Sequence, residues 1–117
     1  MSEKESDLQT KILNDLRSFG KYCECFKIKS ASDNGEPDIF FTTKLTNAVL
    51  VEVKRLNGKA RDLQLVKINK LNTCGTKTFL CHSWSEWVLI KKHLRINMEN
   101  LSEYHNRFFP VIASQNL

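Results

Sequence analysis

The sequence predicts a single α/β domain in which helices flank a mixed four-stranded sheet, in the order αβββαβ(α). Three observations support this fold. Apolar residues recur at helical spacing near both ends of the chain, residues 37–54 form a strand–turn–strand pattern, and a segment of helical length separates that pattern from a short fourth strand. With 117 residues, 41% of them hydrophobic, the chain is long enough for one domain with one modest core.

The charge of the chain suits an anionic partner. Eighteen Lys and Arg residues against thirteen Asp and Glu residues give a net charge of +5, which favours a polyanion such as nucleic acid, although many small proteins are basic. No apolar run approaches the roughly 20 residues of a membrane span, and no apolar segment of a signal peptide follows the first residues. We therefore expect a cytoplasmic protein with no membrane partner.

The first helix is predicted over residues 4–19 and the first strand over residues 22–30. In the strand, the alternation places Phe26 and Ile28 on the core face. The apolar residues of the helix recur at helical spacing at Leu8, Ile12, Leu16 and Phe19.

Residues 37–54 predict an antiparallel hairpin, because two apolar stretches flank the short polar connection at residues 42–47. Side chains alternate between the faces of a strand, so Val49, Val51 and Val53 belong together on the core face of the second strand.

The register of this hairpin brings charged residues together. If the turn is centred near Leu45, Asp38 faces Glu52, and Lys54 lies on the same face. Opposed residues have Cβ atoms roughly 5 Å apart and like charges there repel, so a divalent cation between the two carboxylates is expected, with Lys54 as a second positive charge. The alternative is an ordinary hairpin that carries charges on its solvated face.

The remaining elements complete the sheet and its cover. A helix is predicted over residues 60–73, a strand over 77–81 that lies parallel to its neighbour after this crossover, and a helix over about 85–94. The expected inner face of the first of these helices carries Leu63, Val66 and Leu71.

The four cysteines, Cys23, Cys25, Cys74 and Cys81, are expected to be free thiols in a reducing compartment. A zinc site formed by Cys23, Cys25, Cys81 and His82 is the alternative.

Three motifs together resemble one nuclease family. Gly-Glu-Pro-Asp at residues 35–38, Glu-Val-Lys-Arg at residues 52–55 and Gln64 in the following helix resemble the virus-type replication-repair nuclease (VRR-NUC) family of the PD-(D/E)XK superfamily, in its stand-alone viral form. The resemblance covers about residues 5–90. It implies a restriction-endonuclease-like core over about residues 5–95 of one nuclease domain, followed by a C-terminal extension.

The resemblance implies a magnesium-dependent endodeoxyribonuclease. Asp38 and Glu52 would bind Mg²⁺, for which Mn²⁺ is expected to substitute, and the backbone carbonyl of Val53 would be a third ligand. Glu5, in the first helix, is a further candidate ligand. Its alternative role is to compensate the dipole of that helix.

The same resemblance gives the other site residues. Lys54 would orient the attacking water or neutralise developing charge, and Gln64 would position that lysine or the water; otherwise Gln64 is an exposed helix residue. From the residues alone, the basic connection after the hairpin makes Arg55, Lys59 and Arg61 candidates for contacts to a phosphate backbone beside the metal site.

For the substrate, the resemblance implies branched DNA, in particular a four-way (Holliday) junction cut by a homodimer. Two opposed cuts need two active sites, which a two-fold dimer supplies. The viral resemblance implies the cytoplasm of a phage-infected host cell. A less selective or sequence-specific DNA nuclease, and a binding module without catalysis, are the alternatives. The extension at residues 96–117 either packs on its own core or covers a partner subunit.

Overall fold

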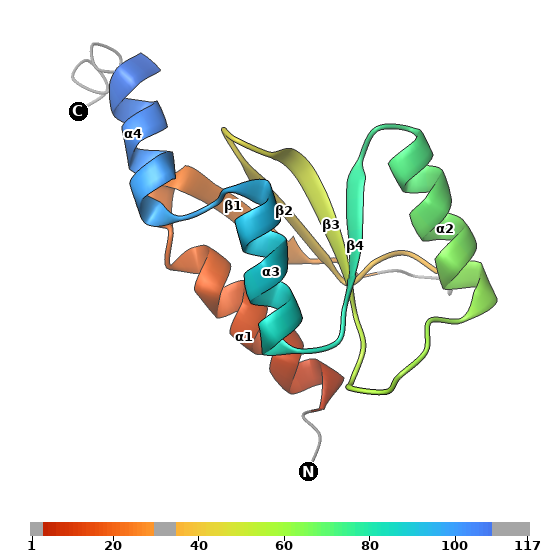
Figure 1. Cartoon of the computed structure of the whole chain (residues 1–117). Coiled ribbons are helices and arrows are strands. Elements are labelled where there is room, and N and C mark those ends of the chain that lie inside the picture. The colour runs from red at the N-terminus through yellow and green to blue at the C-terminus, as the bar shows by residue number, and fades with distance from the viewer. Residues whose placement is uncertain (1–3, 30–34, 109–117) are drawn as a thin grey trace.

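The structure is a computed structural model that describes residues 4–29 and 35–108. It confirms the predicted element order and α/β class (Figure 1). The elements are α1 (Glu5–Arg17), β1 (Cys23–Lys27), β2 (Ile39–Thr43), β3 (Asn47–Val53), α2 (Asp62–Thr73), β4 (Lys77–Cys81), α3 (Trp84–Leu94) and α4 (Met98–Phe108), with a short 3₁₀ turn at Gly20–Tyr22.

The sheet is mixed, with strand order β1-β2-β3-β4. The first two pairings are antiparallel and the third is parallel. Ile39 lies opposite Val51 and Phe41 opposite Val49, which is the register predicted for a turn centred near Leu45. The hydroxyls of Thr43 and Thr46 lie 2.9 Å apart within that turn and help to close it.

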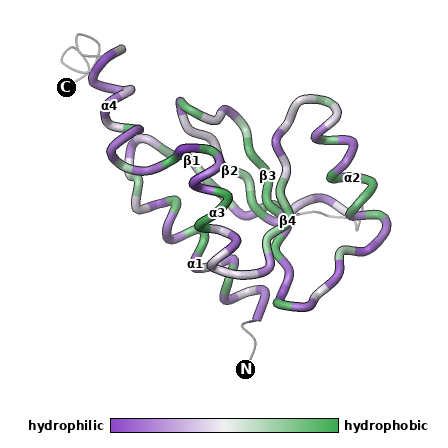
Figure 2. Tube along the Cα trace, viewed as in Figure 1, coloured by the Kyte–Doolittle hydropathy of each residue, from purple (hydrophilic) through white to green (hydrophobic). Residues whose placement is uncertain are grey.

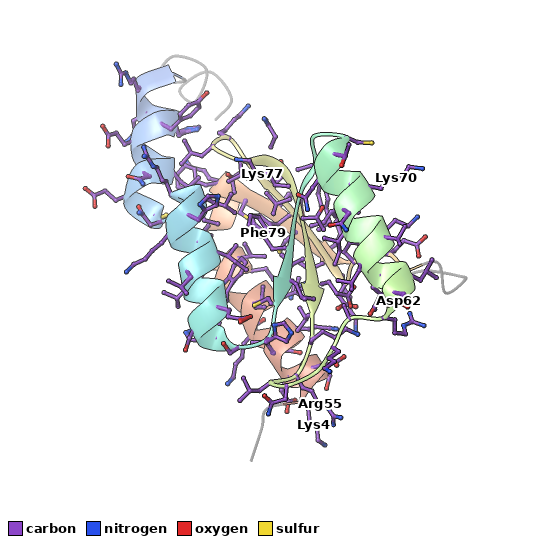
Figure 3. The ribbon with its side chains drawn as sticks, turned by 45° about the vertical axis from the view of Figure 1, so that its right-hand side comes forward. Lys4, Arg55, Asp62, Lys70, Lys77 and Phe79 are labelled. Carbon is purple, nitrogen blue, oxygen red and sulfur yellow. The ribbon has the colours of Figure 1, made fainter. Side chains whose placement is uncertain are left out.

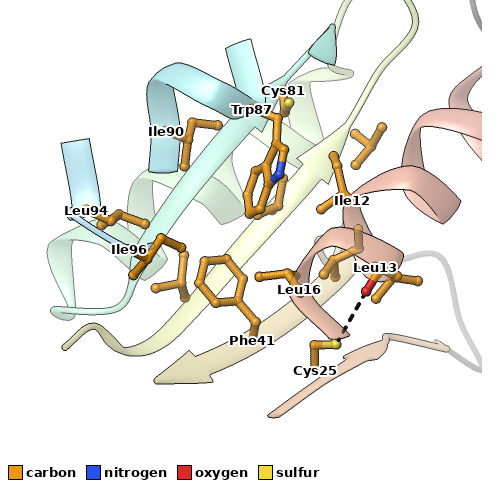
Figure 4. Close-up of a cluster of buried hydrophobic side chains, with 14 of the residues drawn as sticks. Ile12, Leu13, Leu16, Cys25, Phe41, Cys81, Trp87, Ile90, Leu94 and Ile96 are labelled. Atoms are coloured by element: carbon orange, nitrogen blue, oxygen red, sulfur yellow. Dashed lines mark hydrogen bonds between the residues drawn. The ribbon is translucent and has the colours of Figure 1, made fainter. Parts of the chain in front are cut away.

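Helices α1 and α3 cover one face of the sheet, and α2 lies on the other (Figure 1). The apolar core fills the space between the sheet and α1 and α3, where hydrophobic segments gather in Figure 2. Its centre is the edge-to-face pair of Phe41 and Trp87, whose ring centroids are 5.8 Å apart (Figure 4). Trp87 donates its indole N–H to Asp15 at 2.7 Å, so its polar atom is satisfied at the border of the core.

Strand β3 has two very different sides. Val49, Val51 and Val53 are fully buried in the core, as the alternation predicts. The intervening residues Leu50 and Glu52 point to the side of α2. One strand therefore supplies both the middle of the core and the polar face.

In β1 and α2, the buried residues differ from those predicted. Phe26 is 50% exposed, and Cys25 rather than Phe26 is the buried residue of β1. On α2, Leu63 and Val66 are 47% and 63% exposed. The residues of α2 buried against the sheet are Gln64 and Ile68, because this helix packs on a face that carries Glu52 rather than on the apolar core.

A side chain of α2 forms hydrogen bonds with the backbone at the outer edge of β4. Asn72 accepts a hydrogen bond from the backbone N–H of Thr78 at 2.9 Å and donates one to its carbonyl at 3.0 Å. Ser83 then caps the start of α3, because its hydroxyl accepts from the N–H of Glu86 at 3.1 Å.

The C-terminal extension begins as part of the same unit. Ile96 and Leu101 belong to the core cluster, and the ring of His105 in α4 meets Tyr22 edge-on at 5.5 Å. Residues 109–117 lie outside the described residues, so the expectation of a dimer interface there stays a prediction. None of the described helices has the length and apolar character needed to cross a bilayer.

Candidate active site

Asp38 lies on the polar face of the sheet, where two hydrogen bonds hold it against the backbone of β3. The N–H of Asp38 donates to the carbonyl of Val51 at 3.0 Å, which continues the ladder one residue beyond β2. Its side-chain Oδ2 accepts from the N–H of Val53 at 2.8 Å. The Asp38 carboxyl is therefore fixed beside Glu52, as the predicted register requires.

Glu52 is a buried carboxyl, with 2% of its surface exposed. Its Oε1 accepts a hydrogen bond from Gln64 Nε2 at 3.1 Å and lies 3.8 Å from the Lys54 ammonium. Its other oxygen, Oε2, is buried and meets no hydrogen-bond partner among the described residues. A buried oxygen of this kind is costly unless another positive group completes the site.

The surroundings of Glu52 favour its neutral form. Burial is the largest cause, and the adjacent Asp38 carboxyl adds repulsion and a side-chain contact, so the pKa of Glu52 rises to about 8. Lys54 opposes this shift, and the charge of Glu5 adds to it. Two carboxyl groups in such contact hold either a proton or a cation between them.

The donor set fits a divalent cation with oxygen ligands. Asp38 and Glu52 supply two carboxylates, and the orphaned Oε2 of Glu52 supplies a lone pair without another partner. Within residues 4–29 and 35–108, no three His, Cys, Asp or Glu side chains are gathered as a ready metal cluster. Magnesium retains several waters and needs one or two carboxylates, so it matches a set this small.

Glu5 reaches the same end of the sheet from α1. Its Oε1 accepts from the backbone N–H of Arg55 at 3.4 Å, and its charge acts on Glu52. Glu5 thus lies near enough for its charge to act on Glu52, but within the part of the chain that the structure describes it does not form a three-carboxyl cluster with Asp38 and Glu52. Its hydrogen bond ties the start of α1 to the segment that follows β3.

Gln64 joins the start of α2 to the site. Its side-chain oxygen accepts from the N–H of Arg61 at 2.9 Å and its amide donates to Glu52. Its contact is thus with the carboxylate, whereas the sequence suggested the lysine or water. The helix start is also close to the loop before Asp38: a side chain at Gly35 (φ +77°) would place its Cβ 3.0 Å from the carbonyl of Leu63.

The basic candidates Arg55, Lys59 and Arg61 are all exposed on the connection between β3 and α2. Figure 3 shows Arg55 at the end of the molecule near Lys4, away from the helix start at Asp62. These cations therefore spread along the edge of the site, where an extended polyanion could reach them.

His82 holds this basic connection in place, which the sequence did not predict. Its Nδ1 lies 3.0 Å from Glu86 Oε1, and its Nε2 lies 3.0 Å from the carbonyl of Gly58. The N–H of Gly58 in turn donates to the backbone carbonyl of Arg55 at 2.8 Å, which closes a tight turn. Because the partners are 24 residues apart in sequence, no local pattern could have indicated the contact.

The alternative zinc site is not assembled. Cys23 and Cys25 lie on β1 and Cys81 on β4, at opposite edges of the sheet, and both ring nitrogens of His82 contact other groups. Burial raises the pKa of Cys23 to about 12 and that of Cys81 to about 11, so both remain thiols.

Comparison with known proteins identifies the family and the fold. The VRR-NUC domain family matches residues 2–84. A solved structure described as a VRR_NUC domain is 21% identical, with a TM-score of 0.67 over 76% of this chain and 95% of that one. A second, described as a VRR_NUC domain protein, is 15% identical, with a TM-score of 0.63 over 79% and 88%.

The two solved structures are too distant in sequence to establish more than a common fold. A search of curated proteins finds no match. The family match, in contrast, spans most of the sequence, from before the first helix to the start of α3. The chain therefore belongs to the VRR-NUC family and carries a nuclease domain, a class that acts on DNA and typically uses a divalent metal.

Proposed function

We propose that the protein is a magnesium-dependent, structure-selective DNA endonuclease that hydrolyses phosphodiester bonds at four-way junctions. The observation that carries the proposal is the buried Glu52, which lies against Asp38 with one oxygen unpartnered and with Lys54 beside the other. A hairpin with solvated surface charges would not bury a carboxyl in this way.

Asp38 and Glu52 would hold the Mg²⁺, with the carbonyl of Val53 and the carboxylate of Glu5 as further ligands. Mn²⁺ would substitute. The bound ion would acidify its water and withdraw charge from the scissile phosphate. Asp38 suits this role because the N–H of Val53 fixes its carboxylate, so its ligand atom needs no reorientation.

Lys54 would stabilise the charge that develops on the phosphate. Its ammonium lies 3.8 Å from Glu52 and is largely buried, so it stays near the reacting group and is little screened by solvent. Gln64 would keep the Glu52 carboxylate oriented through its hydrogen bond of 3.1 Å. Neither side chain has to move a proton for these roles.

The DNA backbone would contact Arg55, Lys59 and Arg61. These residues are exposed along one connection, and the net charge of +5 favours association with a polyanion. Contacts to phosphates position a substrate without reading its sequence. Contacts of this kind therefore suit recognition of DNA shape.

A homodimer would provide the two active sites that paired cuts in opposed strands require. The rival functions are a less selective or sequence-specific DNA nuclease, which would cut linear duplex, and a non-catalytic module that binds nucleic acid.

The test is cleavage of an end-labelled four-way junction with Mg²⁺, beside linear duplex and single strands. Lys54→Ala is expected to lower the rate about 100- to 1000-fold, the usual cost of losing one electrostatic contributor. Lys92→Ala is the matched control, because Lys92 is exposed on α3, on the other face of the sheet.

Paired nicks on the junction that are lost in Lys54→Ala would support the full proposal. Equal cutting of linear duplex would discard the junction preference and keep the nuclease. If purified protein binds DNA but cuts nothing with Mg²⁺ or Mn²⁺, the non-catalytic module is the better account.

A further inference from the structure

An aromatic pair lies on the same face of the sheet as the candidate active site. Phe40 follows Asp38 by two residues in the extended chain, so both side chains point to the side of α2. Phe26 of β1 is the direct cross-strand partner of Phe40. Their rings are stacked, with centroids 4.8 Å apart and planes inclined by 26°.

This pair is open to solvent because α2 does not cover it. The helix packs against β4, at the far edge of the sheet from β1. Phe26 consequently keeps 50% of its surface exposed and Phe40 is half-buried. The core accounts for neither ring, since the buried residues of β2 are Ile39, Phe41 and Thr43 on the opposite face.

Lys67 of α2 lies on the side of that helix turned towards the middle of the sheet. Gln64 and Ile68 of the helix face the sheet, and Asn72 turns to the outer edge of β4. At 3.6 residues per turn, Lys67 lies on the opposite side of the Gln64–Ile68 line from Asn72, and so on the side away from the outer edge of β4. Lys67 is half-buried, as expected of a long side chain beside the sheet.

Exposed aromatic rings with basic side chains in the neighbourhood are an arrangement that binds single-stranded nucleic acid, because every base has a face that can stack. Along the strand, Phe40 is about 7 Å from Asp38, so a nucleotide next to the scissile phosphate can reach the rings. Bases inside a duplex are already stacked and paired, and only unpaired bases have a face to offer.

We propose that the Phe26–Phe40 pair is a subsite for an unpaired nucleobase of the DNA strand held at Asp38 and Glu52, with Lys67 near the adjoining phosphate. This inference rests on the proposed nuclease function and adds a chemical basis for selectivity. Branched DNA that carries a single-stranded stretch supplies such bases, and a fully paired four-way junction supplies them only where a pair at the crossover opens. Blunt duplex keeps its bases paired.

The test measures binding of DNA to the protein in the presence of a metal chelator, so that no strand is cut. The probes are a single-stranded oligonucleotide that contains 2-aminopurine and a blunt duplex of the same sequence. Phe26→Ala is expected to weaken single-strand binding about 5- to 150-fold, the range that base stacking on an aromatic side chain supports, and to abolish the stacking-induced quenching of 2-aminopurine. Duplex affinity should change less than about twofold.

Two variants make the result specific. Phe26→Trp keeps a stacking surface and should retain binding and quenching. Leu89→Ala removes an apolar side chain that is 63% exposed on α3, across the sheet, and should change neither probe. Circular dichroism and thermal melting establish that each variant is folded.

The proposal is overturned if Phe26→Ala weakens both probes equally or neither, or if the wild type shows no single-strand binding. It is also overturned if sedimentation shows that Phe26→Ala separates a wild-type dimer, because the aromatic face would then be a contact between copies. Cleavage with Mg²⁺ is scored separately, so a failed nuclease and a failed base subsite give different results.

Discussion

Val49, Val51 and Val53 are fully buried between the sheet and helices α1 and α3. On the opposite side of the same strand, Glu52 lies under the start of α2 with an unpartnered oxygen. One face thus stabilises the fold by excluding water, whereas the other holds an ionisable carboxyl in an environment that disfavours its charged form. The alternation of a β-strand separates packing from chemistry within consecutive residues.

The largest expected contrast is between the neighbouring residues Phe41 and Phe40. Phe41→Ala should lower the free energy of unfolding by about 3–5 kcal/mol, because Phe41 is fully buried against Trp87. Phe40→Ala removes the same atoms from the half-buried face and should cost clearly less. Urea denaturation measures both, and equal losses would mean that the two faces do not differ in packing.

The next effect concerns the pH dependence of the metal-free protein. In the folded protein the pKa of Glu52 is raised from about 4.5 to about 8. The protonated carboxyl therefore stabilises the folded state fully below the ordinary glutamate pKa, and this contribution is lost as pH rises towards 8. The unfolding free energy should fall by up to about 1.4 kcal/mol per pH unit in this window. Thermal melting in chelator between pH 4.5 and pH 8 measures it.

Glu52→Gln is the matched variant, because its neutral amide cannot ionise and can donate to Asp38. It should flatten this pH dependence and be more stable than the wild type near pH 8 without metal. Adding Mg²⁺ should then stabilise the wild type and leave the variant unchanged. A slope that persists in Glu52→Gln would assign the pH dependence to another group.

The smallest expected effect is local to the basic connection. The ring nitrogens of His82 contact the Glu86 carboxylate and the carbonyl of Gly58, so the imidazole joins α3 to the basic connection. His82→Ala should cost about 1–2 kcal/mol and speed amide exchange at Gly58, while exchange within β3 stays slow. His93→Ala is the control, since that ring is exposed and has an edge contact with Phe79. Faster exchange throughout the sheet would contradict a local role.

The hairpin register could be predicted from the sequence, because a short turn and the alternation of side chains along each strand together place Asp38 opposite Glu52. The α/β class could be predicted because apolar periodicity indicates which residues are buried when a helix or strand packs on the core. Both predictions depend on interactions between residues close in sequence.

Prediction was wrong where packing against the polar face overrides apolar periodicity. Leu63 and Val66 were expected inside, yet Gln64 occupies the inner face of α2 because it bonds to Glu52. Phe26 was expected in the core, but its edge strand is in the opposite phase and turns it to the open face. Local rules fail most readily where a site imposes other demands.

The side chain of Asn72 has a consequence for the association of copies. An edge strand exposes a row of backbone donors and acceptors that invites another chain to add a strand, which is a common route to aggregation. On β4, Asn72 occupies the N–H and the carbonyl of Thr78 and acts as a one-residue substitute for a neighbouring strand. Growth of the sheet at β4 would first have to displace this amide, so a single asparagine on α2 discourages the molecule from extending into a fibril at that edge.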